Sequence, residues 1–269
     1  MKFERQCIVL PGTRVRLRDH DPDETGGIKS KEKAAKLLEQ STRRLAGLQQ
    51  KLYAEGKRAL LVVLQAMDAG GKDGTIRNVM SGANPQGCRV TSFKAPTAEE
   101  LAHDFLWRIH RAVPARGEIG IFNRSHYEDV LIVRVHRLVP KAVWSARYEQ
   151  INRFEEILAL NGVVIRKFFL HISKREQLAR LEERLHDPAK NWKFNPQDLD
   201  ERKRWGQYVK AYDDALTRCS TLHAPWFIIP ANRKWVRNVA VSSILVETLE
   251  QLDMKFPKPA VDLSRIKLT

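Results

Sequence analysis

Continuous apolar runs alternate with amphipathic stretches along most of this chain. Arg58–Gln65 is the clearest run, and an unbroken apolar segment of this length is typical of a strand buried on both faces. Other apolar segments predict strands at Arg89–Lys94, Glu118–Phe122, Val163–Ile172 and Trp226–Ile229. A helical period between them predicts helices at Lys31–Glu55, Ala98–Arg111, Val143–Leu160, Lys174–Leu185, Leu199–Leu216 and Trp235–Leu252, with another opening at Thr75–Met80.

This alternation of strands and helices predicts the fold class. It favours an α/β protein of three layers, in which helices cover both faces of a central parallel sheet. The pattern begins near residue 29 and ends near residue 255, so we expect one domain over 29–255. An irregular segment, 1–28, precedes it and a tail, 256–269, follows. Ligands of such sheets bind beyond the carboxyl ends of the strands.

The charge of the chain adds a class of partner to this picture. The 269 residues include 47 Lys and Arg against 32 Asp and Glu, which gives a formal charge of +15. Such an excess favours a polyanion, which could be nucleic acid, anionic lipid, a nucleotide or inorganic polyphosphate. A solvated basic surface with no ligand is the simpler alternative. The 43% of hydrophobic residues argues against disorder over most of the chain.

Cysteine usage and hydropathy predict a cytoplasmic protein. Cys7, Cys88 and Cys219 are scattered and form no CxxC pair, which argues against a disulfide framework or a zinc site. The first residues lead into no long apolar region, so no secretory signal is expected. The longest apolar run is far shorter than the roughly 20 residues of a membrane-spanning helix.

The first strand leads into a glycine-rich turn, Gln65–Thr75. The turn resembles the P-loop pattern G-x-x-x-x-G-K-[ST], with Ala66 in place of the first Gly and Asp73 in place of Ser/Thr. Its backbone N–H groups and the following helix N-terminus are predicted to bind phosphate, and Lys72 to reach the terminal phosphates. The predicted phosphate-binding residues of this turn are Ala69, Gly70, Gly71, Asp73, Gly74 and Thr75. An ordinary turn between strand and helix is the alternative.

Asp68 is the residue of this turn that indicates most about the ligand. A carboxylate beside a phosphate site repels the ligand unless a cation lies between them. We therefore predict that Asp68 binds Mg²⁺, or Mn²⁺ in its place, together with phosphate oxygens.

A second polar segment follows the strand at Glu118–Phe122. Arg124 can bind a phosphate in a bidentate manner, and Asn123, Glu128 and Asp129 are candidates for binding the nucleotide or its metal ion. The alternative is a polar loop in which Arg124 pairs with Asp129. We expect His126 to be structural.

A basic helix over Lys174–Leu185 is predicted to form a lid, with bounds near 174–195. Arg180 and Arg184 are four residues apart and share a helical face, while leucines 178, 181 and 185 form an apolar stripe. Such a lid would bury its leucines and bring the arginines over phosphates, with Lys190 and Lys193 nearby. The alternative is a solvated face in which Glu176 pairs with Arg180.

Taken together, three segments resemble the polyphosphate kinase 2 family, a group of P-loop kinases. They are Met67–Gly74, Phe122–Leu131 and His186–Pro188 with Trp192–Phe194, and the resemblance extends from about Asp21 to Lys255. The second segment is similar to that of the subgroup that acts on both AMP and ADP. The subgroup restricted to ADP carries Asp-Arg-Ser there, with Asn in the place of Glu128.

This resemblance implies a reaction and a role for each site residue. The family transfers the terminal phosphoryl group of inorganic polyphosphate to a nucleotide, reversibly and with Mg²⁺. By matching positions, Asp68 would hold Mg²⁺ and Lys72 would neutralise the transferring group. Arg124 would position the acceptor, with Glu128 and Asp129 placing metal or nucleotide. Arg180 and Arg184 would close over the phosphates.

The family also implies a basic channel for polyphosphate and a homo-oligomer, either a dimer or a tetramer. Two other functions stay open at this stage. An ATP-dependent nucleoside monophosphate kinase would share the P-loop and the lid, although Asp73 removes the hydroxyl that usually binds Mg²⁺ with ATP. A nucleic-acid-binding module without activity would fit the charge, although no known binding motif supports it.

Overall fold

A parallel sheet of five strands forms the centre of the protein. The computed structural model describes residues 3–263 and 266. The strand order is β2-β3-β1-β4-β5, and every pairing of neighbours is parallel. Their bounds are β1 (Ala59–Ala66), β2 (Cys88–Ser92), β3 (Ile119–Asn123), β4 (Val163–His171) and β5 (Trp226–Pro230). The predicted fold class is therefore confirmed.

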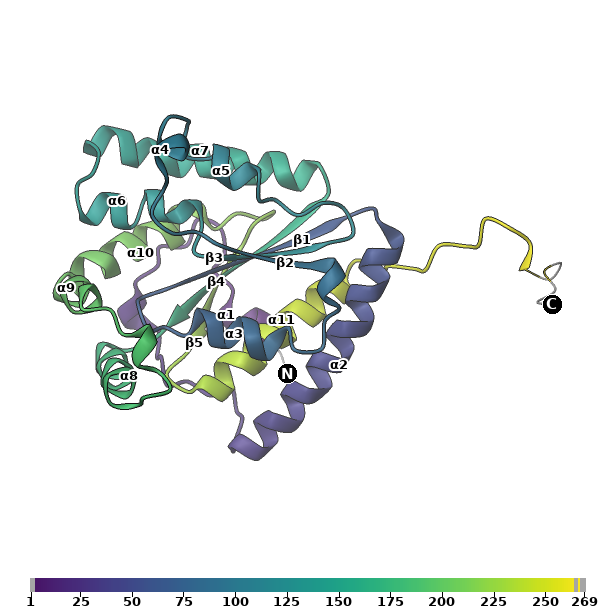
Figure 1. Ribbon diagram of the computed structural model, residues 1–269, viewed down its shortest axis with the longest axis horizontal. Coiled ribbons are helices and arrows are strands. Elements are labelled where there is room, and N and C mark those ends of the chain that lie inside the picture. Colours follow the sequence, from purple (N-terminus) through teal and green to yellow (C-terminus); the bar gives the residue numbers. More distant parts are fainter. Residues whose placement is uncertain (1–2, 264–265, 267–269) are drawn as a thin grey trace.

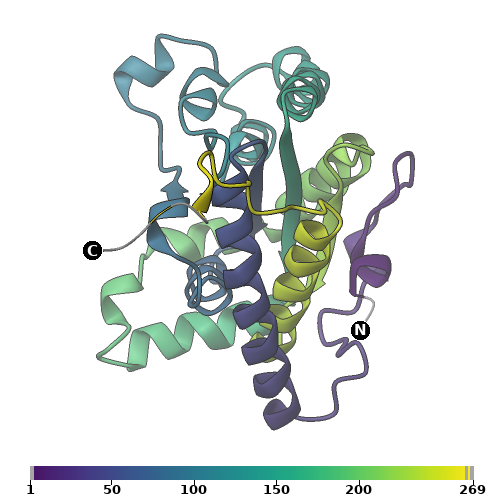
Figure 2. The same ribbon diagram turned by 90° about the vertical axis from the view of Figure 1, so that its right-hand side faces the viewer.

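Helices cover both faces of this sheet (Figure 1). One face carries α1 (Phe3–Cys7), α2 (Lys31–Glu55), α3 (Lys72–Val79) and α11 (Lys234–Glu250), and α2 lies beside α11 (Figure 2). The other carries α4 (Ala98–Leu101), α5 (Trp107–His110), α6 (Ile132–Val135) and α7 (Lys141–Leu160). Beside the carboxyl ends of the strands lie α8 (Lys174–His186), α9 (Gln197–Lys203) and α10 (Trp205–Cys219).

Local signals explain why the longest helix begins and ends where the sequence predicted. The Oγ of Ser30 accepts a hydrogen bond from the N–H of Lys33, which caps the start of α2. Gly56 ends the helix in the left-handed conformation, with φ of +62°. All eight residues of β1 are buried, as the continuous apolar run indicated.

Two predicted helices are each divided into two. The stretch predicted as Ala98–Arg111 breaks before α5 because the Asp104 carboxylate accepts a hydrogen bond from the N–H of Leu106, 2.9 Å away. The stretch predicted as Leu199–Leu216 breaks at Arg204, whose N–H donates to the carbonyl of Glu201, three residues back. Apolar residues keep a helical spacing across both breaks, so the sequence pattern does not indicate where the helices end.

The two ends of the chain differ from each other. Segment 1–28 was predicted to be irregular, but it contains α1 and a turn of 3₁₀ helix at Leu17–Asp19. Residues 256–263 are exposed and run away from the body (Figure 1). The rest of the predicted tail falls largely outside the described residues. Within residues 3–263, no helix combines the length and the apolar character needed to cross a membrane.

A fully buried charged cluster lies behind the carboxyl end of β3. The Lys167 ammonium contacts the Glu155 carboxylate, the Tyr127 hydroxyl and the carbonyl of Cys219. Nε2 of His126 lies 3.1 Å from Oε1 of Glu155, and none of these charged side chains is exposed. Burial raises the pKa of Glu155, but the charges of Lys167 and His126 outweigh it and leave that pKa below its ordinary value. The cluster thus anchors the 3₁₀ turn at His126–Asp129 to the core.

We predict that Lys167→Met lowers the free energy of unfolding by about 3–5 kcal/mol, because it leaves the Glu155 carboxylate buried without its main partner. Glu155→Gln in the same chain should restore part of that loss, since no charge then remains uncompensated. Urea unfolding of both variants measures the difference. A double variant as unstable as the single one would contradict this account.

Candidate active site

A sharply bent loop joins β1 to α3. Ala69 has φ of +59° and Gly71 has φ of +96°, in the left-handed region that favours glycine. A Cβ atom on Gly70 would lie 2.4 Å from the Cβ of Ala66, so a side chain there would clash with the end of β1. Two glycines are therefore needed for the backbone to turn so closely, and α3 starts at once with Lys72.

Side chains of the lid helix α8 donate hydrogen bonds to backbone carbonyl groups of this loop. Nη1 of Arg180 donates to the carbonyl of Ala69 at 3.0 Å, and Nε2 of Gln177 donates to that of Asp68 at 3.0 Å. The remaining nitrogens of Arg180 bind Glu176 and the carbonyls of Ala231 and Asn232. The pair of Glu176 with Arg180, considered as an alternative above, is thus present, at 2.7 Å. Contact of Arg180 with phosphate stays a prediction.

The end of β3 lies directly beside this loop. Parallel pairing sets Leu64 of β1 opposite Asn123, and the N–H of Arg124 donates to the carbonyl of Leu64. Arg124 has φ of +63°, and its Nη2 lies 3.1 Å from Oδ1 of Asp68. The amide of Asn123 donates to Oδ1 of Asp73 at 2.8 Å. Residues predicted from two separate segments therefore come into contact.

Asp129 lies apart from this group. Its carboxylate is 2.9 Å from Nη1 of Arg147, so the pair of Arg124 with Asp129 considered above is not formed. Burial raises the pKa of Asp129 to about 6, against the opposing charge of Arg147. Asp129 lines neither of the two pockets described next.

The first pocket, here called the loop pocket, is basic. Its volume is about 660 Å³, and it lies between the bent loop, the lid and the start of α11. It contains Asp73 and Glu183 together with the following cationic side chains: Lys72, Arg77, Arg180, Arg184, Lys190, Lys193, Lys234 and Arg237. Burial and then the charge of Arg124 lower the pKa of Lys72. This excess of positive charge favours a ligand with several negative charges.

The second pocket, here called the acidic pocket, has a volume of about 170 Å³. Its charged residues are Asp68, Arg124, Glu128, Asp198 and Glu201, and its aromatic residues are Trp205, Tyr208 and Tyr212. Burial and then the charge of Asp68 raise the pKa of Asp198. Aromatic faces beside carboxylates suit a ring that carries N–H donors.

The predicted lid segment lies over the loop pocket. Nη1 of Arg184 is 3.2 Å from Oδ2 of Asp198, and Nζ of Lys193 is 3.9 Å from Oδ2 of Asp73. Lys190 contacts Glu183 and Asp187. Of the three leucines expected to be buried, only Leu181 is; Leu178 and Leu185 are 39% and 50% exposed. The α8 helix therefore packs on the body less extensively than its sequence indicated.

Arg237, on α11, is a residue of the site that the sequence did not identify. It is buried, and its Nη1 would lie 1.9 Å from a Cβ atom built on Gly71. A side chain at position 71 would therefore clash with this guanidinium group. Its guanidinium donates to Oδ1 of Asn238, and no carboxylate of the described residues forms an ion pair with it. Burial and the charge of Arg180 lower the pKa of Arg237 to about 9, which still leaves it charged at neutral pH.

Comparison with known proteins shows which family the chain matches. Residues 28–257 match the family model described as polyphosphate kinase 2. The chain is 55% identical to the AMP/ADP-polyphosphate phosphotransferase of Meiothermus ruber, over 96% of this chain and 97% of that protein. It is 49% identical to the ADP-polyphosphate phosphotransferase of Rhodopseudomonas palustris, over 94% and 92%. The crystal structure of polyphosphate kinase 2 from Arthrobacter aurescens TC1 matches with a TM-score of 0.95 at 44% identity, over 98% and 94%.

We predict that Arg237→Met reduces the thermal stabilisation of the protein by tripolyphosphate. Loss of a buried, charge-assisted contact should weaken binding about tenfold or more, since such contacts contribute roughly 1.5–3 kcal/mol. Differential scanning fluorimetry with increasing tripolyphosphate measures this. Arg233→Met is the matched control, because Arg233 is half exposed and does not line the loop pocket. Equal stabilisation of the two variants would show that Arg237 does not contact the anion.

Proposed function

This chain belongs to the polyphosphate kinase 2 family, and we propose that it transfers the terminal phosphoryl group of inorganic polyphosphate to AMP and to ADP, reversibly. The names of its relatives support the reaction, and the 55% identity with the Meiothermus ruber protein supports both acceptors. Glu128, which lines the acidic pocket, matches the subgroup that uses AMP as well as ADP. A cytoplasmic homo-oligomer that does not bind nucleic acid also remains our prediction.

One observation carries the proposal, namely that two pockets of opposite charge meet at the bent loop. Asp68 lines the acidic pocket, and the next residue, Ala69, lines the basic loop pocket. A donor made only of phosphates fits the basic side, and the nucleoside of an acceptor fits the aromatic, acidic side. The acceptor phosphate and the donor's end group would then meet near Asp68 and Lys72.

The chain's own residues can supply the positioning and the charge that this reaction needs. Phosphoryl transfer requires alignment of donor and acceptor and stabilisation of negative charge, with little covalent chemistry by the protein. Lys72 lies at the start of α3, where the helix N-terminus adds positive charge. Arg124 can hold the acceptor phosphate with its two terminal nitrogens. Arg184 and Lys193 of the lid would neutralise the donor chain.

The donor set at Asp68 fits a magnesium ion. The structure shows no cluster of three or more His, Cys, Asp or Glu side chains within its described part that could hold a metal. Mg²⁺ is commonly bound by one or two carboxylates together with substrate phosphates. Asp68 and Glu128, which line the same pocket, would therefore be enough protein ligands for it. When bound, the ion would supply positive charge to the phosphate oxygens; Mn²⁺ could replace it.

The other candidate functions have less support. An ATP-dependent nucleoside monophosphate kinase would share the fold, but the relatives are named for polyphosphate. Asp73, which replaces the usual hydroxyl residue, accepts a hydrogen bond from the amide of Asn123. No observation on the described residues favours a nucleic-acid-binding module.

We expect the purified protein with Mg²⁺ to form ATP from ADP when long-chain polyphosphate is the only phosphoryl donor. With AMP in place of ADP, ADP should appear first and ATP later. Chromatographic separation of the nucleotides over time follows both. Activity with ATP and AMP, but none with polyphosphate, would indicate the monophosphate kinase instead.

We further expect Asp68→Asn and Lys72→Ala to lower kcat by about 10²–10³, the usual effect of removing one preorganised charge contact at a reacting group. Both residues are at least partly exposed, so the fold should persist, as circular dichroism would verify. Lys57→Ala, at the opposite end of the sheet, serves as the control for loss of a surface charge. A kcat near the wild-type value in either site variant would show that the substituted residue takes no part in the reaction.

A further inference from the structure

Asn232, between β5 and α11, joins two segments that lie far from it in the sequence. The N–H of Ala231 extends the pairing of β5 with β4 by donating to the carbonyl of His171 at 2.8 Å. Asn232 therefore lies beside Ser173, the residue that precedes the lid helix. The N–H of Asn232 donates to the carbonyl of Pro22 at 3.1 Å, which attaches the N-terminal segment at the same point.

The side-chain amide of Asn232 bonds to both of these segments. Its Oδ1 accepts a hydrogen bond from the N–H of Ser173 at 2.9 Å. Its Nδ2 donates to Oδ2 of Asp23 at 2.9 Å and to Oγ of Ser173 at 3.4 Å. An ionised carboxylate such as that of Asp23 only accepts hydrogen bonds, so it determines which side of the amide faces it. The two neighbours thus require one donor and one acceptor on the same side chain, which a carboxamide supplies.

Ser173 and Asn232 in turn hold the lid helix α8. The Oγ of Ser173 accepts a hydrogen bond from the N–H of Glu176 at 3.1 Å, which caps the first turn of α8. The carbonyl of Asn232 accepts a hydrogen bond from Nη2 of Arg180 at 3.1 Å, one turn further along. Asn232 therefore fixes α8 both at its start and at its buried arginine.

The part of α8 that is held in this way is the part that contacts the bent loop. Gln177 donates to the carbonyl of Asp68, and Arg180 donates to that of Ala69. Both donors are buried, with 3% and 6% of their surface exposed, so water competes little for these hydrogen bonds. A shift of α8 would either move the loop with it or break these bonds, and in both cases Asp68 would be displaced.

We propose that Asn232 is a positioning residue for phosphoryl transfer, which holds Asp68 in place through Ser173 and the lid helix. This inference rests on the proposed function. Asn232 lines neither the loop pocket nor the acidic pocket, so it acts through α8 and not by contact with a substrate. Alignment of donor and acceptor supplies much of the rate, and a displacement of about 1 Å caused far from the reacting atoms can lower it about a hundredfold.

The test uses the contact between Asn232 and Asp23. Asn232→Asp replaces the donor by a carboxylate that faces the carboxylate of Asp23, and the two repel each other. We expect kcat for ATP formation from ADP and polyphosphate to fall about tenfold or more. The KM for each substrate should change little, since no contact with a substrate is lost. Asp23→Asn in the same chain provides a new amide donor and should restore most of the kcat, whereas Asp23→Asn alone should lower kcat less than Asn232→Asp does.

Recovery in the double variant distinguishes positioning from a general loss of stability. Thermal unfolding of each variant gives the folded fraction to which kcat is referred. The proposal is overturned if Asn232→Asp keeps the wild-type kcat, or if the double variant is as slow as the single one. Should Asn232→Asp not fold, Asn232→Ala removes the amide contacts without adding charge, and a wild-type kcat in that variant would equally overturn the proposal.

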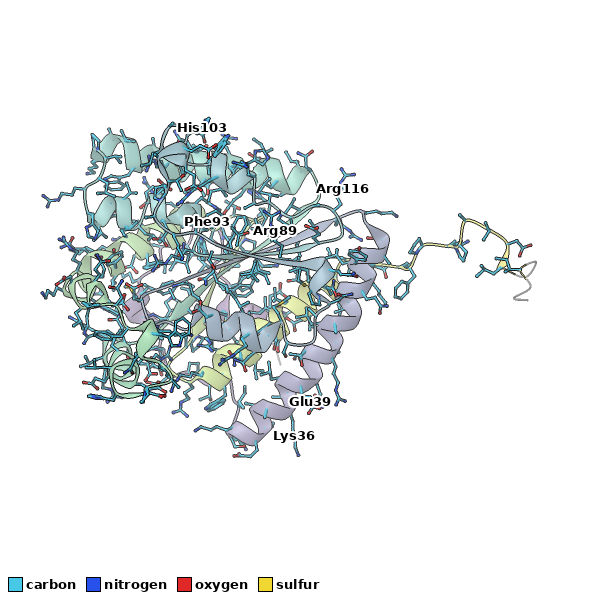
Figure 3. The ribbon with its side chains drawn as sticks, viewed as in Figure 1. Lys36, Glu39, Arg89, Phe93, His103 and Arg116 are labelled. Atoms are coloured by element: carbon cyan, nitrogen blue, oxygen red, sulfur yellow. The ribbon has the colours of Figure 1, made fainter. Side chains whose placement is uncertain are left out.

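A matched control adds one negative charge at an exposed amide, through Gln40→Glu on α2. Figure 3 shows Lys36 and Glu39, which precede this position on α2, well apart from α8. Gln40 lines neither pocket of the site, so kcat should stay at the wild-type value. A fall as large as that of Asn232→Asp would overturn the proposal, because the added charge alone would then explain the effect.

Hydrogen–deuterium exchange separates this inference from the proposed function, because it needs no reaction. In the absence of substrates, Asn232→Asp should speed amide exchange in residues 66–75 and 173–181, and the added Asp23→Asn should reverse this. If these changes occur but the wild-type protein transfers no phosphoryl group from polyphosphate, the proposed function fails and the coupling of Asn232 to the loop stands. If the wild-type protein is active but Asn232→Asp leaves exchange in residues 66–75 unchanged, the inference alone fails.

Discussion

The parallel pairing of β1 with β3 is the constraint on which the site depends. Because Leu64 lies opposite Asn123, β3 ends two residues before β1 does, and the polar segments that follow the two strands begin close together. The turns place non-glycine residues at positive φ, at Ala69 and Arg124. Such strained backbone persists only where surrounding contacts determine it, and here hydrogen bonds from Arg180 and to Leu64 do so. Asp68 and Arg124 then meet without either loop having to be long.

This arrangement concentrates positive charge in the loop pocket, where eight cationic side chains lie with two carboxylates. Among the described residues, Arg237 is buried with an amide oxygen as its only hydrogen-bond partner, and burial lowers the pKa of Lys72. Desolvated cations of this kind reduce stability in the absence of a ligand, because an isolated charge in the interior is costly. The same desolvation strengthens their attraction to phosphates, because charges interact more strongly where the surroundings are less polar than water. The buried cluster of Glu155 with Lys167 shows the contrasting case, in which the chain supplies both charges.

The sequence predicted those features that local chemistry determines. Ser30 and Gly56 mark the ends of α2, and the apolar run and the glycines predict β1 and the bent loop. The pair of Arg180 with Glu176 was an alternative that the sequence offered. The contacts of Arg180 with backbone carbonyls and the role of Arg237 could not be predicted, because the sequence does not reveal which charged residues become buried. A basic run after β5, at the level of the other strand ends, was the available signal for Arg237. Likewise, the break before α5 depends on one side chain, Asp104, and not on the period.

The two pockets are also connected through the lid. Arg184 lines the loop pocket, while its partner Asp198 lines the acidic pocket. A polyanion in the loop pocket competes with Asp198 for Arg184, and a carboxylate released in this way makes the acidic pocket more negative. That change disfavours a further anion there and favours the neutral, N–H-bearing face of a nucleobase, by Coulomb's law alone. One ion pair thus makes the charge of each pocket depend on the occupancy of the other, which is a direct reason for the two to discriminate between a chain of phosphates and a nucleoside.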